Sequence, residues 1–309
     1  MSDPDADPSG PFDARYVAFL ETITTLRPSL HRYCSRMTGS VLEGEDIVQE
    51  ALFQAYRKLD DWDETRPLGP WLFRIAHNRC IDFLRRRGVR LEAETTAAAP
   101  DCVDAADPPG PDLGRAVEQL VTALPPKERA CVLLKDVFDY TLEEIAELVD
   151  STTGGVKSAL NRGRTKRAAM SGAAPRAAAP AASPLLQLYV DRFNRQDWDG
   201  LRELIAADAR LQVADRFRGR IADSPYFSRY QRLADHLRLA IASLDGEIVL
   251  AALGRVDGGW SAQSVLRLEL SGDRIARIVD YVHCPWVMAN ALSLEIADGD
   301  GVSPAGLPA

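Results

Sequence analysis

The sequence has few cysteines and no long apolar run. Its five cysteines stand singly along 309 residues, without the close Cys/His pairs that a structural zinc site needs. Their odd number and their scatter favour a reducing compartment over a disulfide framework. No apolar stretch approaches the roughly 18–20 residues of a membrane-spanning helix, and the acidic start MSDPDADPSGPFDARY lacks the features of a signal peptide. We therefore expect a cytoplasmic protein without membrane contact.

Positive charge is also in deficit. The chain has 37 Lys and Arg against 45 Asp and Glu, a formal net charge of −8. This balance disfavours indiscriminate adhesion to nucleic acid, so a polyanionic partner must be met by a local basic surface. His31 and Cys34 are a two-ligand fragment at best, and we interpret them as ordinary core or surface residues. The sequence predicts neither a bound metal nor a cofactor.

Two low-complexity segments divide the chain into pieces. Residues 91–112 carry six carboxylates and several prolines but no Lys or Arg, which predicts an acidic flexible linker. Residues 170–183 are rich in Ala and Pro and predict a second linker. Three folded pieces remain, at 12–90, 113–169 and 184–295. A chain of this length is expected to hold more than one domain.

The first piece is helical in pattern. In EGEDIVQEALFQAYRKLDDW the apolar spacing predicts one buried stripe, made of Val48, Leu52, Ala55 and Leu59. The opposite stripe of the same helix holds Asp46, Gln49, Glu50, Phe53 and Arg57. A polar loop, DDWDETRPLGP, leads to a second helical stretch, WLFRIAHNRCIDFLRRRGVR, with six arginines against one aspartate. This second stretch is a basic patch.

The second piece has the pattern of a helix-turn-helix. Thr141 and Glu144 form a predicted capping box before a short helix that buries Ile145, Ala146 and Leu148. Thr152 or Thr153 then caps a second helix. Its inward residues are Val156, Ala159 and Leu160, and its outward residues are Lys157, Ser158, Asn161, Arg162 and Arg164. In a helix-turn-helix the second helix lies in the major groove of DNA.

The third piece changes from helices to strands. Helical patterns cover 184–208 and 225–244, and β-like runs cover 209–219, 246–256, 260–272 and 273–283. Asp257 and Gly258 stand between two alternating runs, a strong hairpin signal. Helices followed by a meander of antiparallel strands predict an α+β domain.

Three motifs in this order carry a family resemblance. GEDIVQEALFQAYRKLDDW, WLFRIAHNRCIDFLRRR and ALPPKERACVLLKDVFDYTLEEIAELVDSTTGGVKSALNRGRTK resemble the two conserved domains of an extracytoplasmic-function (group IV) sigma factor of bacterial RNA polymerase. One helix-turn-helix alone would be a weak signal with many hosts. The resemblance implies a multi-domain protein with two all-α domains, sigma region 2 as a helical bundle at 12–90 and sigma region 4 as a helix-turn-helix at 113–169.

The resemblance also implies two partners, core RNA polymerase and promoter DNA, and a set of residues for each. Core polymerase would be bound by Asp46, Gln49, Glu50, Phe53 and Arg57. The −10 element would be bound by Asn78, Arg79 and Asp82 near the bases and by Arg85, Arg86 and Arg87 at phosphates. The −35 element would be bound as duplex by Thr152, Thr153, Lys157, Ser158, Asn161, Arg162 and Arg164. Thr152 has an equally good interpretation as a helix cap, and the two roles are compatible.

Some positions depart from the family pattern. Gly155 and Ala159 stand where larger residues are common, and Asp150 stands where a turn glycine is usual. Gly155 and Gly163 within the second helix should each cost roughly 1 kcal/mol of helix propensity relative to alanine. These departures bear on the DNA sequence that is recognised rather than on the mode of binding.

The third piece is similar to the SnoaL-like polyketide-cyclase superfamily, a cone-shaped α+β barrel of helices against a curved sheet. That resemblance implies an acid–base pair in the cone, for which Asp280 and His283 are candidates, with Tyr281, Arg277 and Trp260 nearby. Because a fold does not imply a function, we favour structural roles for these residues and assign no catalytic residue. Asp280 and Tyr281 are neighbours on an alternating strand and so must face opposite ways.

The sequence therefore predicts a sigma factor that is not an enzyme and whose SnoaL-like domain regulates it in cis. A small ligand and intramolecular docking are both open for that domain, with Trp286 and Tyr226 as docking candidates that would serve equally well in its core. Two other classes stay open: a ligand-sensing helix-turn-helix regulator, and a SnoaL-type isomerase or cyclase fused to DNA-binding domains. The N-terminal piece favours the sigma factor, because a ligand-sensing regulator has no need for it.

Overall fold

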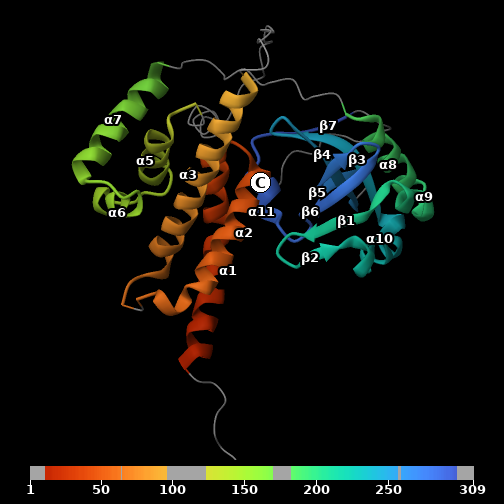
Figure 1. Ribbon diagram of the computed structural model, residues 1–309, viewed down its shortest axis with the longest axis horizontal. Coiled ribbons are helices and arrows are strands. Elements are labelled where there is room, and N and C mark those ends of the chain that lie inside the picture. The colour runs from red at the N-terminus through yellow and green to blue at the C-terminus, as the bar shows by residue number, and fades with distance from the viewer. Residues whose placement is uncertain (1–10, 64, 96–122, 170–181, 257–258, 298–309) are drawn as a thin grey trace, which may run out of the picture. The chain divides into compact units, whose positions relative to one another are not determined.

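The computed structural model describes residues 11–63, 65–95, 123–169, 182–256 and 259–297 (Figure 1). The chain divides into two compact units, Met1–Ala174 and Pro175–Ala309. Most of the predicted acidic linker, most of the Ala/Pro linker and the predicted hairpin turn at 257–258 lie outside the described residues. The domain boundaries given above stay predictions.

The first unit begins with three helices. Helix α1 spans Pro11–Thr38, α2 spans Val41–Arg57 and α3 spans Leu68–Thr95, with a short 3-10 turn, η1, at Leu59–Asp61. The Ser40 hydroxyl accepts a hydrogen bond from the backbone N–H of Glu43 at 3.2 Å and so caps α2. The predicted buried stripe of α2 is confirmed, with Leu52 half-buried against the same core.

Helix α3 is longer than the sequence pattern predicted. It continues through Thr95, into the segment that was expected to be linker from residue 91. The physical reason is local: Leu91, Glu92, Ala93 and Glu94 are all good helix formers, and the next proline is not reached until Pro100.

The helix-turn-helix is confirmed. Helix α5 spans Pro126–Asp136, α6 spans Leu142–Leu148 and α7 spans Thr153–Ala169. Both hydrogen bonds of the capping box form: the Glu144 N–H donates to Thr141 Oγ1 at 3.2 Å, and the Thr141 N–H donates to Glu144 Oε2 at 2.7 Å. The predicted inward residues of α6 and α7 are all buried.

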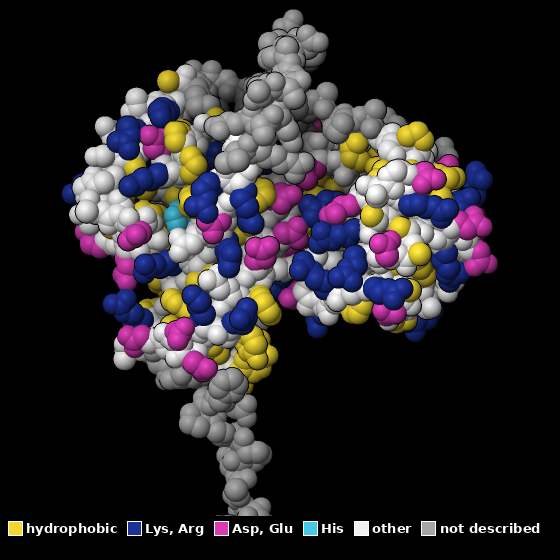
Figure 2. Space-filling view, viewed as in Figure 1, with side chains coloured by type: hydrophobic (Ala, Val, Ile, Leu, Met, Phe, Trp, Pro, Cys, Tyr) yellow, Lys and Arg dark blue, Asp and Glu magenta, His cyan; other side chains and the backbone are white. Residues whose placement is uncertain are grey.

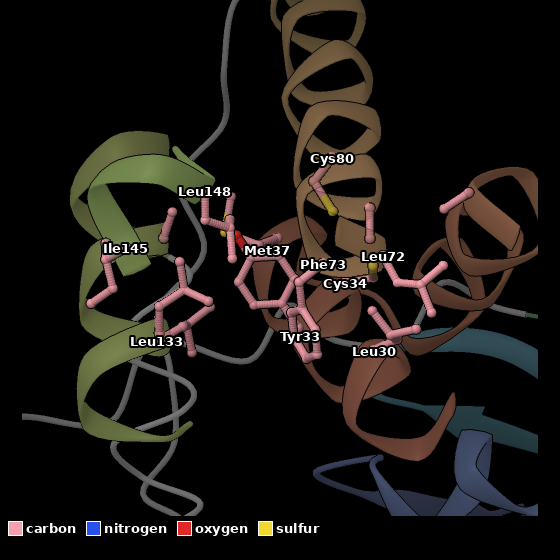
Figure 3. Close-up of a cluster of buried hydrophobic side chains, with 14 of the residues drawn as sticks. Leu30, Tyr33, Cys34, Met37, Leu72, Phe73, Cys80, Leu133, Ile145 and Leu148 are labelled. Carbon is pink, nitrogen blue, oxygen red and sulfur yellow. The ribbon is translucent and has the colours of Figure 1, made fainter. Parts of the chain in front are cut away.

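The two groups of helices in the first unit share one core. Figure 3 shows side chains of α1 and α3, such as Tyr33 and Phe73, lying beside Leu133 of α5 and Ile145 and Leu148 of α6. The rings of Tyr33 and Phe73 are 5.6 Å apart, and each contacts the ring of Phe138, at 6.0 and 5.6 Å. Tyr33 and Phe73 thus join the three N-terminal helices to the helix-turn-helix.

Two glycines in this unit allow helices to approach closely. A Cβ atom on Gly44 of α2 would lie 2.7 and 2.8 Å from the backbone N and Cα of Ser35 in α1. A Cβ atom on Gly163 of α7 would lie 2.8 Å from Cγ2 of Val132 in α5. Because real Cβ atoms do not tolerate such distances, both helix contacts depend on glycine.

The second unit is an α+β domain, as predicted. Its helices are α8 (Pro184–Asn194), α9 (Trp198–Glu203), α10 (Tyr226–Leu233) and α11 (Pro285–Ala289), with short 3-10 turns η2 (Ile221–Asp223) and η3 (Ala234–His236). Its strands are β1 (Ile205–Val213), β2 (Phe217–Arg220), β3 (Leu237–Leu244), β4 (Glu247–Val256), β5 (Gly259–Ser271), β6 (Arg274–Asp280) and β7 (Leu294–Ile296). They form one sheet in the order β2-β1-β6-β5-β4-β3-β7. Helices lying against a twisted sheet are the architecture that the SnoaL-like resemblance implied.

Three features of the sheet differ from the prediction. Strand β1 begins at Ile205, whereas the helical pattern was expected to continue to residue 208. Residues 237–244 form strand β3, whereas the helical pattern was expected to continue to residue 244. Strand β1 pairs with β6 in parallel, whereas an all-antiparallel meander was expected. The run from β3 to β6 is antiparallel, and the predicted hairpin is confirmed by the pairing of Val256 with Gly259.

The two faces of the sheet have different surroundings, because directly paired residues share a face. On the first face, Leu211, Leu250, Leu266 and Ile278 pack in a core with residues of α8 and α10. On the second face the central positions are apolar and the positions at the β1–β2 end are arginine. The apolar residues of this face include Ala251, Val265 and Val279, and its arginines include Arg210, Arg218, Arg220 and Arg277.

Candidate functional site

The stripe predicted on α2 is accessible. Glu50, Phe53 and Arg57 are exposed, and Asp46 and Gln49 are half-buried on the same side of the helix. The Phe53 side chain is 64% exposed, and the Arg57 guanidinium lies 6.0 Å from the centre of its ring. An exposed aromatic ring beside carboxylates and a cation suits a protein interface better than a solvated helix face.

Further exposed apolar residues continue this surface onto α1. Tyr56 of α2 is 47% exposed, and its ring lies 5.7 Å from that of Tyr16, which is 36% exposed. Val17 and Leu20 of α1 are 51% and 44% exposed. The sequence prediction omitted these four residues. The i, i+3 spacing of Phe53 and Tyr56 was the available signal, since it places both rings on adjacent turns.

A buried ion pair supports the stripe from below. Arg27 Nη2 of α1 lies 2.7 Å from Glu45 Oε1 of α2, and both side chains are buried. The Gln49 amide donates to the same Glu45 oxygen at 3.0 Å. Gln49 is therefore held by the core of the unit while it contributes to the surface.

The basic helix α3 presents part of its predicted DNA-binding set. Asn78, Arg85, Arg86 and Arg87 are exposed. Arg79 is half-buried, and its Nε donates to Gln54 Oε1 at 2.8 Å. Asp82 is half-buried and lies 3.1 Å from an Arg85 nitrogen. Arg79 and Asp82 thus have partners within the protein, whereas Asn78 and the last two arginines have accessible side chains.

The opposite side of α3 contains a buried histidine. His77 Nδ1 lies 2.8 Å from the Tyr33 hydroxyl. Burial lowers the pKa of His77 from 6.5 to about 4, and burial lowers the pKa of His31 in α1 to about 4 as well. His31 Nε2 lies 2.9 Å from the Val41 carbonyl oxygen. Both rings are buried in the core, which decides between the core and surface roles left open for His31.

The first half of α7 presents accessible polar side chains. Thr152 Oγ1 accepts from the Gly155 N–H at 3.1 Å, so Thr152 acts as the helix cap. Lys157, Ser158 and Asn161 are exposed, and Thr153 is half-buried. These side chains come from the first turns of the helix, which is the part that contacts base edges in helix-turn-helix proteins.

The second half of α7 is held to α5 by two carboxylates. Glu128 binds Arg162 Nε at 2.9 Å and Lys166 Nζ at 2.9 Å, and these cations lower the pKa of Glu128. Asp136 pairs with Arg164 and with Arg167, the latter at 3.5 Å. Arg162 and Arg164, predicted as outward DNA-binding residues, are exposed and ion-paired to α5.

The turn before α7 takes an unusual backbone conformation. Asp150 has a φ of 49°, in the left-handed region that favours glycine. The Ser151 N–H donates to the Ala146 carbonyl at 2.9 Å and closes the end of α6. The conformation explains why glycine is usual at this position of the family. Aspartate is one of the few other residues that tolerate it.

Asp280 and His283, the candidates for an acid–base pair in the C-terminal unit, have different hydrogen-bond partners. Asp280 is buried and bonded by two tyrosines: Tyr226 OH donates to Oδ2 at 3.1 Å and Tyr230 OH donates to it at 2.5 Å. Burial raises the pKa of the Asp280 carboxyl. His283 instead lies 3.3 Å from an Arg229 nitrogen. Tyr226, a docking candidate above, is a core residue.

The other residues named for the cone are also dispersed. Trp260 stacks under the Arg238 guanidinium, 4.7 Å from the ring centre. Arg277 bonds Glu269 and Gln212, at 3.1 and 2.6 Å. Across the described ranges of the chain, no group of three or more His, Cys, Asp or Glu could hold a metal ion. No helix among the described residues is long and apolar enough to cross a bilayer.

Two family models match ranges of this sequence. The Sigma-70 region 2 model matches residues 22–90, and the Sigma-70 region 4 model matches residues 114–166. The crystal structure of the extracytoplasmic function sigma factor SigJ of Mycobacterium tuberculosis aligns over 84% of this chain and 95% of that chain, with 18% identity and a TM-score of 0.34.

Two curated relatives share more of their sequence. The ECF RNA polymerase sigma factor SigW of Bacillus subtilis (strain 168) is 33% identical over 159 residues, which are 48% of this chain and 85% of SigW. The ECF RNA polymerase sigma factor SigG of Mycobacterium tuberculosis (strain H37Rv) is 32% identical over 229 residues, which are 64% of this chain and 62% of SigG. The chain therefore belongs to the extracytoplasmic-function family of RNA polymerase sigma factors and acts in transcription initiation.

Proposed function

We propose that this sigma factor binds core RNA polymerase through the exposed stripe of α2 and reads promoter DNA with α3 and α7. The observation that carries the proposal is the accessible combination of Phe53, Glu50 and Arg57 on a helix whose other side is buried in the core. Tyr56, Tyr16, Val17 and Leu20 enlarge the same interface. A factor with these partners works in the cytoplasm, where the polymerase and the chromosome are.

We assign the −10 and −35 contacts by accessibility. In α3, Arg86 and Arg87 hold phosphates, and Asn78 is the side chain best placed to meet a base. In α7, Lys157, Ser158 and Asn161 enter the major groove, with Asn161 suited to the edge of adenine. Arg162 and Arg164 are ion-paired to Glu128 and Asp136, and these pairs orient the helix in the free protein.

Charge reversal separates these roles. Asp46→Arg with Glu50→Arg should abolish association with core polymerase and leave affinity for −35 duplex unchanged. Lys157→Glu should weaken −35 binding about tenfold and leave polymerase association intact. Lys157 is the sharper choice than Arg162, because Arg162→Glu would place a second carboxylate against Glu128. Co-purification with core enzyme and run-off transcription measure the two steps.

Arg195→Glu is the matched control, since Arg195 is an exposed arginine on the C-terminal unit. It should retain both activities. If the α2 and α7 variants lose the same step, the division of labour is wrong. If the unaltered chain gives no polymerase-dependent transcript from any promoter, the proposed function itself fails.

We further propose that the C-terminal unit is a regulatory domain without catalytic activity. Its buried carboxylate, Asp280, is engaged by Tyr226, Tyr230 and the Val282 N–H rather than by a histidine. On the second face of its sheet Val265 and Val279 are buried, and the five-residue helix α11 packs against β5.

A further inference from the structure

The arginines of strands β1, β2 and β6 form a row on the second face of the sheet, at its β2 edge. Arg220 of β2 is directly opposite Arg210 of β1, and Arg210 is directly opposite Arg277 of β6. Direct partners on neighbouring strands lie about 5 Å apart on one face. Strand β2 is the outermost strand at this end of the sheet, so the row begins at a free edge.

Such a row is unfavourable for the domain by itself. Like charges placed directly opposite each other in a strand pair are destabilising. Among the described residues of this unit, acids and arginines are equal in number and lysine is absent, so the row is a local concentration of charge. The arginine row costs stability, and the overall charge of the unit does not explain it. It therefore points to an external anion.

The arginines are held in place largely without being neutralised. Gln212 is buried, and its Oε1 accepts hydrogen bonds from Arg218 Nη2 at 2.8 Å and from Arg277 Nη2 at 2.6 Å. An uncharged amide thus positions two guanidinium groups and leaves their charges in place. Glu269 pairs with Arg277 at 3.1 Å, at the end of the row farthest from β2.

The outer part of the row is accessible. Arg210, Arg216, Arg218 and Arg220 are all exposed, and Figure 2 shows basic side chains gathered over β1 and β2. The acids nearest in the chain are Asp208, in the irregular part of β1 between Ile205 and Arg210, and Asp215 in the β1–β2 turn. We call Arg210, Arg216, Arg218 and Arg220 the edge arginines.

We propose that the edge arginines bind the phosphate backbone of duplex DNA next to the promoter. Guanidinium groups match phosphate oxygens with two parallel hydrogen bonds, and a row of them follows a charged backbone without reading bases. An acidic protein surface is a weaker fit, because protein interfaces use an apolar anchor, and the exposed apolar residue of β2, Phe217, lies on the opposite face from Arg218 and Arg220.

Covalent connection to α7 makes the contact reachable. Residues 170–183 can span at most about 50 Å when fully extended, since each residue adds at most ~3.6 Å. When α7 is on the −35 element, the edge arginines are thereby confined to DNA within a few turns of it, at high effective concentration. The contact would add affinity for upstream DNA of any sequence.

The test uses the full chain and a fluorescent duplex that lacks promoter elements. Arg210→Glu with Arg220→Glu should weaken binding about tenfold, and the slope of log K against log salt should become shallower by about 2, since each lost phosphate contact contributes about 0.9. The control pair is Arg195→Glu with Arg255→Glu, two exposed arginines elsewhere on the same unit, and it should leave the slope unchanged.

Three results would overturn the proposal. The first is an unchanged slope in the reversed pair. The second is loss of binding to poly-glutamate with unchanged binding to the duplex, which would indicate an acidic protein partner. The third is a lowered melting temperature of Arg210→Gln with Arg220→Gln together with an unchanged slope of log K against log salt, which would mean that the row is structural. This neutral pair also replaces the charge-reversed pair if the reversal impairs folding. Run-off transcription by the variants reports separately on the proposed sigma function.

Discussion

At the scale of single residues, Gly163 is best understood by what it allows rather than by its helix propensity. The sequence predicted a cost of roughly 1 kcal/mol for this glycine in a helix. The structure accounts for it, because α7 passes so close to α5 that a Cβ atom would lie 2.8 Å from Val132 Cγ2 and 3.4 Å from the Glu128 carbonyl oxygen. Close packing therefore outweighs propensity at this position.

We predict that Gly163→Ala lowers the free energy of unfolding by about 1–3 kcal/mol, the usual cost of overpacking. Gly88→Ala in α3 is the matched control. A Cβ there meets nothing within 4 Å, so the variant should be more stable by up to about 1 kcal/mol. Urea unfolding of the two variants would decide, and a stabilised Gly163→Ala would show that the helix contact relaxes easily.

The buried histidines make the first unit sensitive to acid. Their pKa values fall from 6.5 to about 4 on folding, so the folded state holds them neutral. The unfolded chain then binds more protons than the folded chain as the pH falls below 6.5, and stability decreases from there towards pH 4. Well above pH 6.5 both histidines are neutral in the folded and the unfolded chain, so they no longer make the unfolding free energy depend on pH.

We predict that His77→Gln flattens this decline. Glutamine has no charge to gain, so the difference in unfolding free energy between pH 7.5 and pH 5 should shrink, even if the variant is less stable at pH 7.5. His236→Gln, which changes an exposed histidine of the other unit, should leave the pH dependence as it is. An identical decline in His77→Gln and the unaltered protein would contradict the argument.

Residue types in the site could be predicted, but not their partners. The stripe of α2 and the outward residues of α7 follow from helical periodicity, which the sequence displays directly. That Arg162 and Arg164 are ion-paired to Glu128 and Asp136 does not follow, because these contacts join residues far apart in the chain. Tyr16 and Tyr56 were missed for a related reason, since an apolar residue on a helix is expected to be buried.

At the scale of elements, local signals succeeded where they were chemically specific. The capping box of α6 and the β4–β5 hairpin each need particular residues at particular spacings, and both form. Strand β3 was missed because LRLAIASL fits a helical and an alternating pattern equally well. In the folded protein β3 pairs with both β4 and β7, and this pairing favours a strand over a helix for residues 237–244.

The parallel pairing of β1 with β6 illustrates the same limit. Helix α9 precedes β1 and strand β2 follows it in the chain, and β6, the fifth strand after β1, returns beside it. Nothing in either strand's own sequence encodes that partner, since both are ordinary half-buried strands. Their register matters nonetheless, because it alone places Arg210 opposite Arg277.

At the scale of the whole molecule, the open question of regulation has a direct test. We predict that a chain ending at residue 174 gives more run-off transcript per molecule than the full chain, because the regulatory domain is gone. Cleavage of the segment 91–112 by a protease should become faster in the same truncation. Lost transcription would favour an activating role, and no change in either assay would remove the regulatory proposal.

The shared aromatic core of the first unit bears on how such factors could be engineered. Sigma regions are attractive modules for promoter chimeras, in which one factor's −35 reader replaces another's. Here Phe138 and Tyr140 belong to the reader half, and they pack on Tyr33 and Phe73 of the other half. A graft that changes only the outward face of α7 keeps this seam intact. A graft that exchanges all of 113–169 also replaces Phe138 and Tyr140, which pack against the first half. If that chimera failed, the cause could be this lost packing rather than promoter recognition.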